Sequence, residues 1–143
     1  MRAGAGVALT LCVLFSSAHC GEPKPKLPSP ANYPKFVQGS AQAICTRLTH
    51  CTKKIIRTLS PGLQTRVTVD GCVATALDGV AARLAVHTPE MVQFSVMCYQ
   101  AIVDAPCDQI GFIAYWHPGC TTLRQISNER FRLFPVARPP DFD

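Results

Sequence analysis

Apolar residues recur at helical spacing through the middle of the chain. Ile44, Leu48, Cys51 and Ile55 follow one another at intervals of three or four residues, which places them on one face of a helix. The run Ser60-Pro61-Gly62 then predicts a break, because proline and glycine both interrupt helices. A first long helix is therefore expected before this break.

Three further helices are predicted downstream. The second begins after Thr68, and its apolar residues share one face: Val69, Val73, Leu77, Val80 and Leu84. The third begins at Thr88-Pro89-Glu90, where Thr caps the helix, Pro fits the first helical position and Glu meets the positive end of the dipole. Its inward residues are Met91, Phe94, Cys98 and Ile102. A short fourth helix runs from about Cys107 to Tyr115 and ends at a turn, His117-Pro118-Gly119.

No stretch alternates apolar and polar residues as a half-buried strand does. The expected fold is all-α: a small disulfide-stapled bundle of three helices plus a short fourth helix, with an extended Pro-rich N-terminal tether. The expected segments are a signal peptide over 1–19, a Pro/Lys-rich tether over 20–38, a helical disulfide domain over 39–127 and an extended or disordered tail over 128–143.

The N-terminus has the features of an export signal. Arg2 provides a positive start, and Val7–Phe15 is an apolar run of nine residues. This run is shorter than the about 20 residues that span a bilayer. Cys20 lies just past it, where a bacterial lipoprotein carries its lipidated cysteine, although His19 is not the usual small residue. We expect lipidation at Cys20, and the alternative is free secretion after cleavage behind Ser16-Ser17-Ala18.

Five prolines lie between Pro23 and Pro34, with Lys24, Lys26 and Lys35 nearby. Because proline blocks helix and ladder hydrogen bonds, this stretch is predicted to be an extended, solvated spacer between a lipid and the domain. The other interpretation is a disordered N-terminal arm without a lipid.

Six cysteines follow Cys20, an even set that is typical of a disulfide framework in an exported chain: Cys45, Cys51, Cys72, Cys98, Cys107 and Cys120. We expect the first two helices to be antiparallel and the third to be parallel to the first. Offsets along the helix axes, at about 1.5 Å per residue, then favour the pairs Cys45–Cys98 and Cys51–Cys72. The remaining pair, Cys107–Cys120, would close the fourth helix.

Catalysis and metal binding have little support in the sequence. His50 beside Cys51, and His117 near Cys120, offer metal-binding atoms, but their spacing does not match the close ligand pairs of zinc sites. The sequence has no Gly-x-Ser-x-Gly elbow, no His-Glu-x-x-His and no glycine loop for a phosphate. We expect a non-enzymatic protein with no metal and no cofactor.

Positive charge is concentrated in the first half of the chain. From Pro23 to Val69 there are eight basic residues and no acidic residue. We expect a basic face that consists of Lys35, Arg47, Lys53, Lys54, Arg57 and Arg66. Such a face suits an anionic surface or a protein partner, and the alternative is a solvated helix face without a partner. Nucleic acid is not expected, because no stacking pattern of aromatic residues accompanies the basic ones.

Two aromatic segments remain. Trp116, the only tryptophan, is expected to cover a small core beside a disulfide, and the alternative is a binding anchor. The segment Arg130–Val136 alternates basic and apolar residues. We expect it to pack on its own domain as an extended arm, and the alternative is strand addition to a partner.

The cysteines and their neighbours form a recognisable layout. Its parts are Ala43-Ile44-Cys45 followed by Cys51, a lone Cys72, Cys98-Tyr99-Gln100-Ala101-Ile102 followed by Cys107, and Pro118-Gly119-Cys120. This layout resembles that of small cysteine-rich lipoproteins of bacterial envelopes, of the kind that spirochaetes carry. The resemblance implies an exported protein in the outer membrane or periplasm, and it supplies no catalytic or ligand residue.

The sequence thus predicts a non-enzymatic exported envelope protein, attached to the membrane through an N-terminal lipid. Its helical domain would serve binding or a structural role. The alternative is a freely secreted binding module, an inhibitor or effector, that acts through its basic face or its C-terminal tail.

Overall fold

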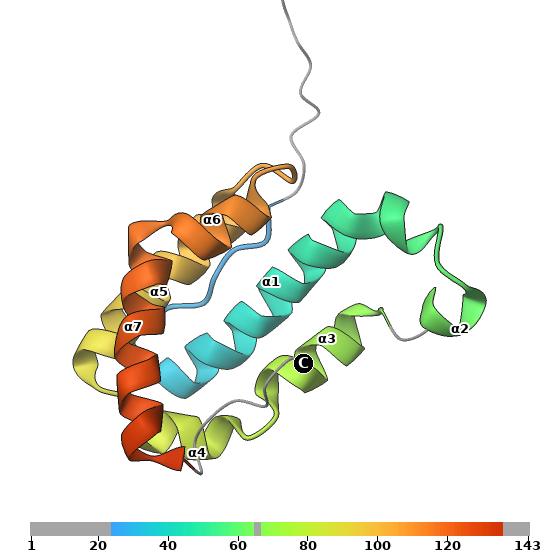
Figure 1. Cartoon of the computed structure of the whole chain (residues 1–143). Coiled ribbons are helices and arrows are strands. Elements are labelled where there is room, and N and C mark those ends of the chain that lie inside the picture. The colour runs from blue at the N-terminus through green and yellow to red at the C-terminus, as the bar shows by residue number, and fades with distance from the viewer. Residues whose placement is uncertain (1–23, 65–66, 136–143) are drawn as a thin grey trace, which may run out of the picture.

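All regular structure in the described chain is helical. The computed structural model describes residues 24–64 and 67–135, and no strand occurs in these ranges (Figure 1). The all-α, disulfide-stapled fold predicted from the sequence is confirmed. The helices are α1 (Tyr33–Ile56), α2 (Pro61–Gln64), α3 (Val69–Leu77), α4 (Val80–Ala85), α5 (Pro89–Asp104), α6 (Ile110–Trp116) and α7 (Pro118–Leu133).

Helix α1 begins earlier than predicted. Asn32 caps it by accepting a hydrogen bond from the backbone N of Lys35 at 3.2 Å. Pro34 lies in the first turn, where its missing N–H has no intrahelical partner to lose. Residues 33–38, which the sequence assigned to the tether, are therefore the first turns of α1.

The described part of the tether, residues 24–32, contains no helix or strand and runs as an extended segment along α1 (Figure 1). It contacts the domain: a Cβ added at Gly39 of α1 would overlap the ring of Pro28. The prediction of a solvated spacer is therefore wrong around Pro28, because the absence of a side chain at Gly39 lets the proline pack on the helix.

The second predicted helix is two helices joined by a corner. α3 ends at Leu77, and α4 starts at Val80. Between them Gly79 has φ 62°, in the left-handed region that residues with a Cβ rarely adopt. The apolar spacing continues across the corner, which is why the pattern predicted one helix. α5, by contrast, begins at Pro89 behind the Thr88 cap, as predicted.

The largest departure from the sequence prediction is α7. Instead of forming a turn, His117 caps this helix, because its Nδ1 accepts a hydrogen bond from Gly119 N at 3.2 Å. Pro118 occupies the first turn of α7, which continues for 16 residues to Leu133. The prediction of an extended or disordered tail is therefore wrong for residues 128–133. Residues 136–143 lie outside the described ranges.

Three disulfides join the helices, and all six of the expected cysteines take part. The bonds are Cys45–Cys72 between α1 and α3, Cys51–Cys107 between α1 and the α5–α6 loop, and Cys98–Cys120 between α5 and α7. The predicted pairs Cys45–Cys98, Cys51–Cys72 and Cys107–Cys120 are all wrong.

The geometry of α1 and α7 explains this error. The return segment between α1 and α3 brings Cys72 to the level of Cys45, which lies roughly 9 Å along α1 from Cys51. Those two α1 cysteines are also rotated by roughly 240° from each other about the helix axis, so they face different neighbours. Finally, the unpredicted helix α7 brings Cys120 to Cys98, with 4.5 Å between their Cα atoms.

The main core lies where α5 packs along α7. It consists of Cys98, Ile102, Ala105, Ile110 and Cys120, and Met91 with Phe131 forms a second cluster. Gly119 permits this contact: a Cβ there would lie 2.9 Å from Met97 Cβ and 3.3 Å from Cys98 N. In the described ranges, no helix is both long enough and apolar enough to cross a membrane.

Candidate functional site

A cavity of about 660 Å³ lies among α1, α4, α5 and α7. We call it the central cavity. Its apolar wall includes Val37 of α1, Val80 and Leu84 of α4, and Leu123 and Phe131 of α7. The Cys98–Cys120 disulfide also lines it and ties α5 to α7. The volume falls within the range of about 300–1,000 Å³ that is typical of small-molecule sites.

A chain of hydrogen bonds includes two polar residues of the cavity wall, Ser95 and His87. The Tyr33 hydroxyl donates to Ser95 Oγ at 3.0 Å, and Ser95 Oγ donates to Met91 O at 2.7 Å. The Tyr33 oxygen also lies 2.8 Å from His87 Nδ1. Since the Tyr33 proton goes to Ser95, Nδ1 of His87 carries a proton and donates it to Tyr33. Nε2 of the neutral ring is then a hydrogen-bond acceptor.

Burial keeps this hydrogen-bonded chain neutral. It raises the pKa of Tyr33 to about 12, and the hydrogen bond to Ser95 opposes this rise. Burial also lowers the pKa of His87, and the positive charge of Arg83 lowers it further. Near neutral pH, neither the Tyr33 nor the His87 ring carries a charge.

Two arginines supply the formal charges on the cavity wall, Arg83 of α4 and Arg124 of α7. Each donates to a backbone carbonyl: Arg83 Nη2 to Ala76 O at 2.7 Å, and Arg124 Nη2 to Tyr115 O at 3.0 Å. The Arg124 guanidinium also lies over the Tyr115 ring, 4.5 Å from its centroid. Among the residues that the structure describes, no carboxylate forms an ion pair with either arginine.

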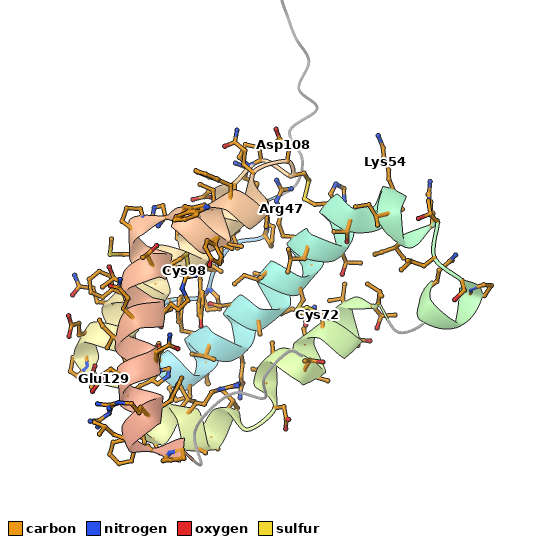
Figure 2. The ribbon with its side chains drawn as sticks, in the orientation of Figure 1. Arg47, Lys54, Cys72, Cys98, Asp108 and Glu129 are labelled. Atoms are coloured by element: carbon orange, nitrogen blue, oxygen red, sulfur yellow. A yellow bond between two sulfur atoms is a disulfide. The ribbon has the colours of Figure 1, made fainter. Side chains whose placement is uncertain are left out.

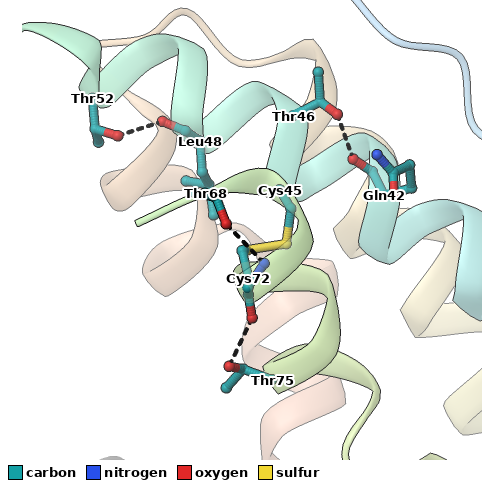
Figure 3. The surroundings of a disulfide bond; sticks show 9 residues. Gln42, Cys45, Thr46, Leu48, Thr52, Thr68, Cys72 and Thr75 are labelled. Carbon is teal, nitrogen blue, oxygen red and sulfur yellow. Dashed lines mark hydrogen bonds between the residues drawn. A yellow bond between two sulfur atoms is a disulfide. The ribbon is translucent and has the colours of Figure 1, made fainter. Parts of the chain in front are cut away.

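A second cavity, of about 410 Å³, lies between α1 and α3 beside the Cys45–Cys72 disulfide. Figure 3 shows the threonine hydroxyls around this bond. Thr52 Oγ1 donates to Leu48 O at 2.7 Å, and Thr75 Oγ1 donates to Gly71 O at 2.9 Å. Because these hydroxyl protons bond to their own helices, this cavity offers a ligand less hydrogen bonding than the central cavity does.

Arg47 does not belong to an exposed basic face, contrary to the prediction. Its side chain is 2% exposed, and its Nη2 donates to Ala105 O at 2.8 Å, on the side of α1 that faces the end of α5 (Figure 2). The sequence pattern predicted an exposed Arg47 side chain, because arginine is usually exposed. Here the guanidinium bonds the carbonyl that follows α5.

The other predicted basic residues do not form one surface. Lys53, Lys54 and Arg57 are exposed at the end of α1, where Lys54 points into solvent (Figure 2). Lys35 is exposed at the other end of α1, roughly 27 Å away along the axis. Arg66 lies outside the described residues. We call Lys53, Lys54 and Arg57 the basic cluster; positive charge at this end also favours the helix dipole.

Helix α6 carries an exposed aromatic face, which consists of Phe112, Tyr115 and Trp116. The exposed fractions of these side chains are 64%, 57% and 63%. Their spacing places them on one side of the helix. Trp116 therefore does not cover the core, contrary to the prediction. Ile113 and Ala114, on the other side of α6, pack against the core instead.

Three further expectations concern a metal site, the lipidation site and the Arg130–Val136 segment. No group of three His, Cys, Asp or Glu side chains placed to hold a metal occurs in residues 24–64 and 67–135. Cys20 and the segment 1–19 lie outside these ranges. Within the predicted contact segment, Arg130 and Phe131 belong to α7: Arg130 Nε donates to Val86 O at 2.9 Å, and Phe131 lines the central cavity.

We did not predict the central cavity or its polar residues from the sequence. No pattern in the sequence distinguished His87, Arg83 or Arg124 as residues of a cavity. The cavity depends on the corner at Gly79 and on α7. The sequence signal that could have revealed α7 was Pro118, because proline is common in the first turn of a helix as well as in turns.

No family model, no curated protein and no solved structure matches this chain. Its class is therefore defined by its own structure: a small helical domain stapled by three disulfides. Disulfides of this number indicate an oxidising, exported environment.

Proposed function

We propose that this protein is an exported, non-enzymatic binding module that holds a small, mostly apolar molecule in the central cavity. The observation that carries the proposal is a cavity of about 660 Å³ with apolar residues and the hydrogen-bonded polar residues Ser95 and His87 on its wall. Ligand sites in helical bundles commonly have this composition. The disulfide between α5 and α7 holds two walls of the cavity in place without a ligand.

The hydrogen bonds in the cavity support a binding role over catalysis. A serine nucleophile needs a base that accepts its proton. Here Ser95 Oγ donates to Met91 O, and Tyr33 lies between Ser95 and His87. The imidazole therefore does not bond the serine hydroxyl, and the arrangement fixes side chains instead of activating one.

A fluorescent apolar probe tests the binding proposal. N-phenyl-1-naphthylamine should bind the native protein in a saturable manner with an increase in emission. Val80→Trp would fill part of the cavity and should weaken binding about tenfold, whereas Ala82→Trp is a matched control on an exposed position of the same helix. Absence of saturable binding to the wild-type protein, or equal binding to both variants, would contradict the proposal.

Lipid attachment at Cys20 is the second candidate function, in which the domain is displayed at a bacterial envelope. One specific observation favours it. Lys24 Nζ donates to Asp104 O at 2.6 Å at the end of α5, so the chain enters the domain close to the start of α6. A membrane on that side would be near the aromatic face, and such residues suit membrane interfaces. The basic cluster is a candidate contact for an anionic partner.

Detergent phase partition and intact mass test this second candidate. The native protein should enter the detergent phase and carry acyl mass on Cys20, and Cys20→Ala should move it to the aqueous phase. The emission of Trp116, the sole tryptophan, should shift to the blue on phospholipid vesicles. A mature chain that starts at His19 without a lipid would rule the anchor out and leave free secretion.

A further inference from the structure

The central cavity has an unbalanced charge. Its wall contains two cationic side chains, Arg83 and Arg124, and no aspartate or glutamate. Neither guanidinium has an ion-pair partner within the described part of the chain. A cation on the wall of a partly desolvated cavity favours an anion, because charge-assisted hydrogen bonds are roughly twice as strong as neutral ones. A neutral apolar ligand would leave both guanidinium groups without an anionic partner.

Arg83 is the better placed of the two arginines. It shares the cavity wall with His87 and Tyr99, and its charge lowers the pKa of His87 and opposes the rise in the pKa of Tyr99 that burial causes. One N–H group bonds Ala76 O, which orients the guanidinium and leaves its other N–H groups for a ligand. The Arg124 guanidinium, by contrast, stacks on Tyr115 and bonds its carbonyl.

Apolar residues on two helices of the wall suit an alkyl chain. Val80 and Leu84 belong to the helix that carries Arg83, while Leu123 and Phe131 face the cavity from α7. The wall therefore combines a positive group from α4 with apolar side chains from two helices. A molecule that matches both features has a charged head and an apolar tail.

From this combination we propose that the ligand of the central cavity is a single-chain anionic amphiphile, of the long-chain carboxylate class, and that Arg83 binds its head group. This proposal rests on the proposed binding function, since it names the ligand of the same cavity. The carboxylate pairs with the guanidinium, and the alkyl chain lies against the apolar wall.

Competition against the fluorescent probe tests the ligand class on the full-length native protein. Three amphiphiles with the same chain length are compared below their micelle concentrations near neutral pH: dodecanoate, dodecan-1-ol and dodecyltrimethylammonium. Dodecanoate should displace the probe at a concentration about tenfold lower than dodecan-1-ol, which corresponds to about 1.4 kcal/mol. The cationic amphiphile should be the weakest competitor.

Two variants test the residue. Arg83→Gln should remove most of the preference for dodecanoate over dodecan-1-ol. Lys26→Gln, which removes the same charge from an exposed position of the extended N-terminal segment, should leave it unchanged. If Arg83→Gln fails to fold, Arg83→Lys keeps a positive charge and should retain part of the preference.

The outcomes separate the ligand class from the function. Equal displacement by dodecanoate and dodecan-1-ol, or a preference that survives Arg83→Gln, would overturn this proposal and leave the binding function intact. A probe that binds but is displaced by none of the three amphiphiles would also overturn it. Failure of the probe to bind the wild-type protein would refute the binding function itself.

Discussion

The contact between α5 and α7 depends on the absence of a side chain at Gly119. An alanine Cβ at this position would lie 2.9 Å from Met97 Cβ and 3.3 Å from Cys98 N. The helices have little freedom to separate, because the Cys98–Cys120 bond holds Cα atoms 4.5 Å apart next to the contact. Overpacking of this kind costs about 1–3 kcal/mol. Gly119→Ala should therefore destabilise the protein.

Gly111→Ala provides a matched control. This glycine lies in α6, and a Cβ there meets no atom within 4 Å. Both substitutions remove the same conformational entropy from the unfolded chain, which stabilises by about 0.4–1 kcal/mol where the new side chain fits. The two variants should consequently differ by the overpacking cost alone, about 1–3 kcal/mol.

Urea unfolding with the disulfides intact, followed by far-ultraviolet circular dichroism, measures this difference. A third variant, Gly39→Ala, should lose less stability than Gly119→Ala, since none of the three disulfides lies next to the contact between the Pro28 segment and Gly39. Equal stability of Gly119→Ala and Gly111→Ala would refute the described packing of α7 on α5, and with it two walls of the central cavity.

Three further predictions concern the disulfides, the cavity histidine and a helix cap. Replacing Cys51 and Cys107 by alanine should cost about 4 kcal/mol in urea unfolding, from the chain entropy of a 56-residue separation; a loss below about 1 kcal/mol would contradict the bond. Because the pKa of His87 is lowered, the unfolded chain binds more protons as pH falls through about 6.5, so the free energy of unfolding should decrease there. His87→Gln should reduce the dependence of the free energy of unfolding on pH near 6.5. An unchanged dependence would contradict its assignment to His87. Thr88→Ala removes the cap of α5 and should cost about 1 kcal/mol in the same assay, whereas Thr46→Ala, an exposed hydroxyl within α1, should cost less.

The sequence was most informative where local signals agreed with one another. Thr88-Pro89-Glu90 predicted the start of α5, because a cap, a proline and an acid agree there. The even set of cysteines predicted a disulfide framework. The corner at Gly79 was missed because the spacing of apolar residues shows which side of a helix is buried but does not show where the helix axis changes direction.

Long-range arrangement was beyond the sequence pattern. The cysteine pairs depend on the rotation of Cys45 and Cys51 about α1 and on the length of the return to α3, and neither is encoded in helical spacing. Proline is common both in turns and in the first turn of a helix, so Pro118 did not reveal α7. The partner of Cys98, which lies on α7, was missed for the same reason. The buried guanidinium of Arg47 likewise depends on a carbonyl 58 residues away.

The most direct test of ligand binding in the central cavity is a titration of ¹⁵N-labelled protein with dodecanoate, followed by amide chemical shifts. Binding in the cavity predicts saturable shifts at cavity residues on different helices, such as Arg83, Ser95 and Leu123, with little change at Lys54 on the exposed end of α1. Shifts confined to the aromatic face of α6, or no shifts at all, would contradict it.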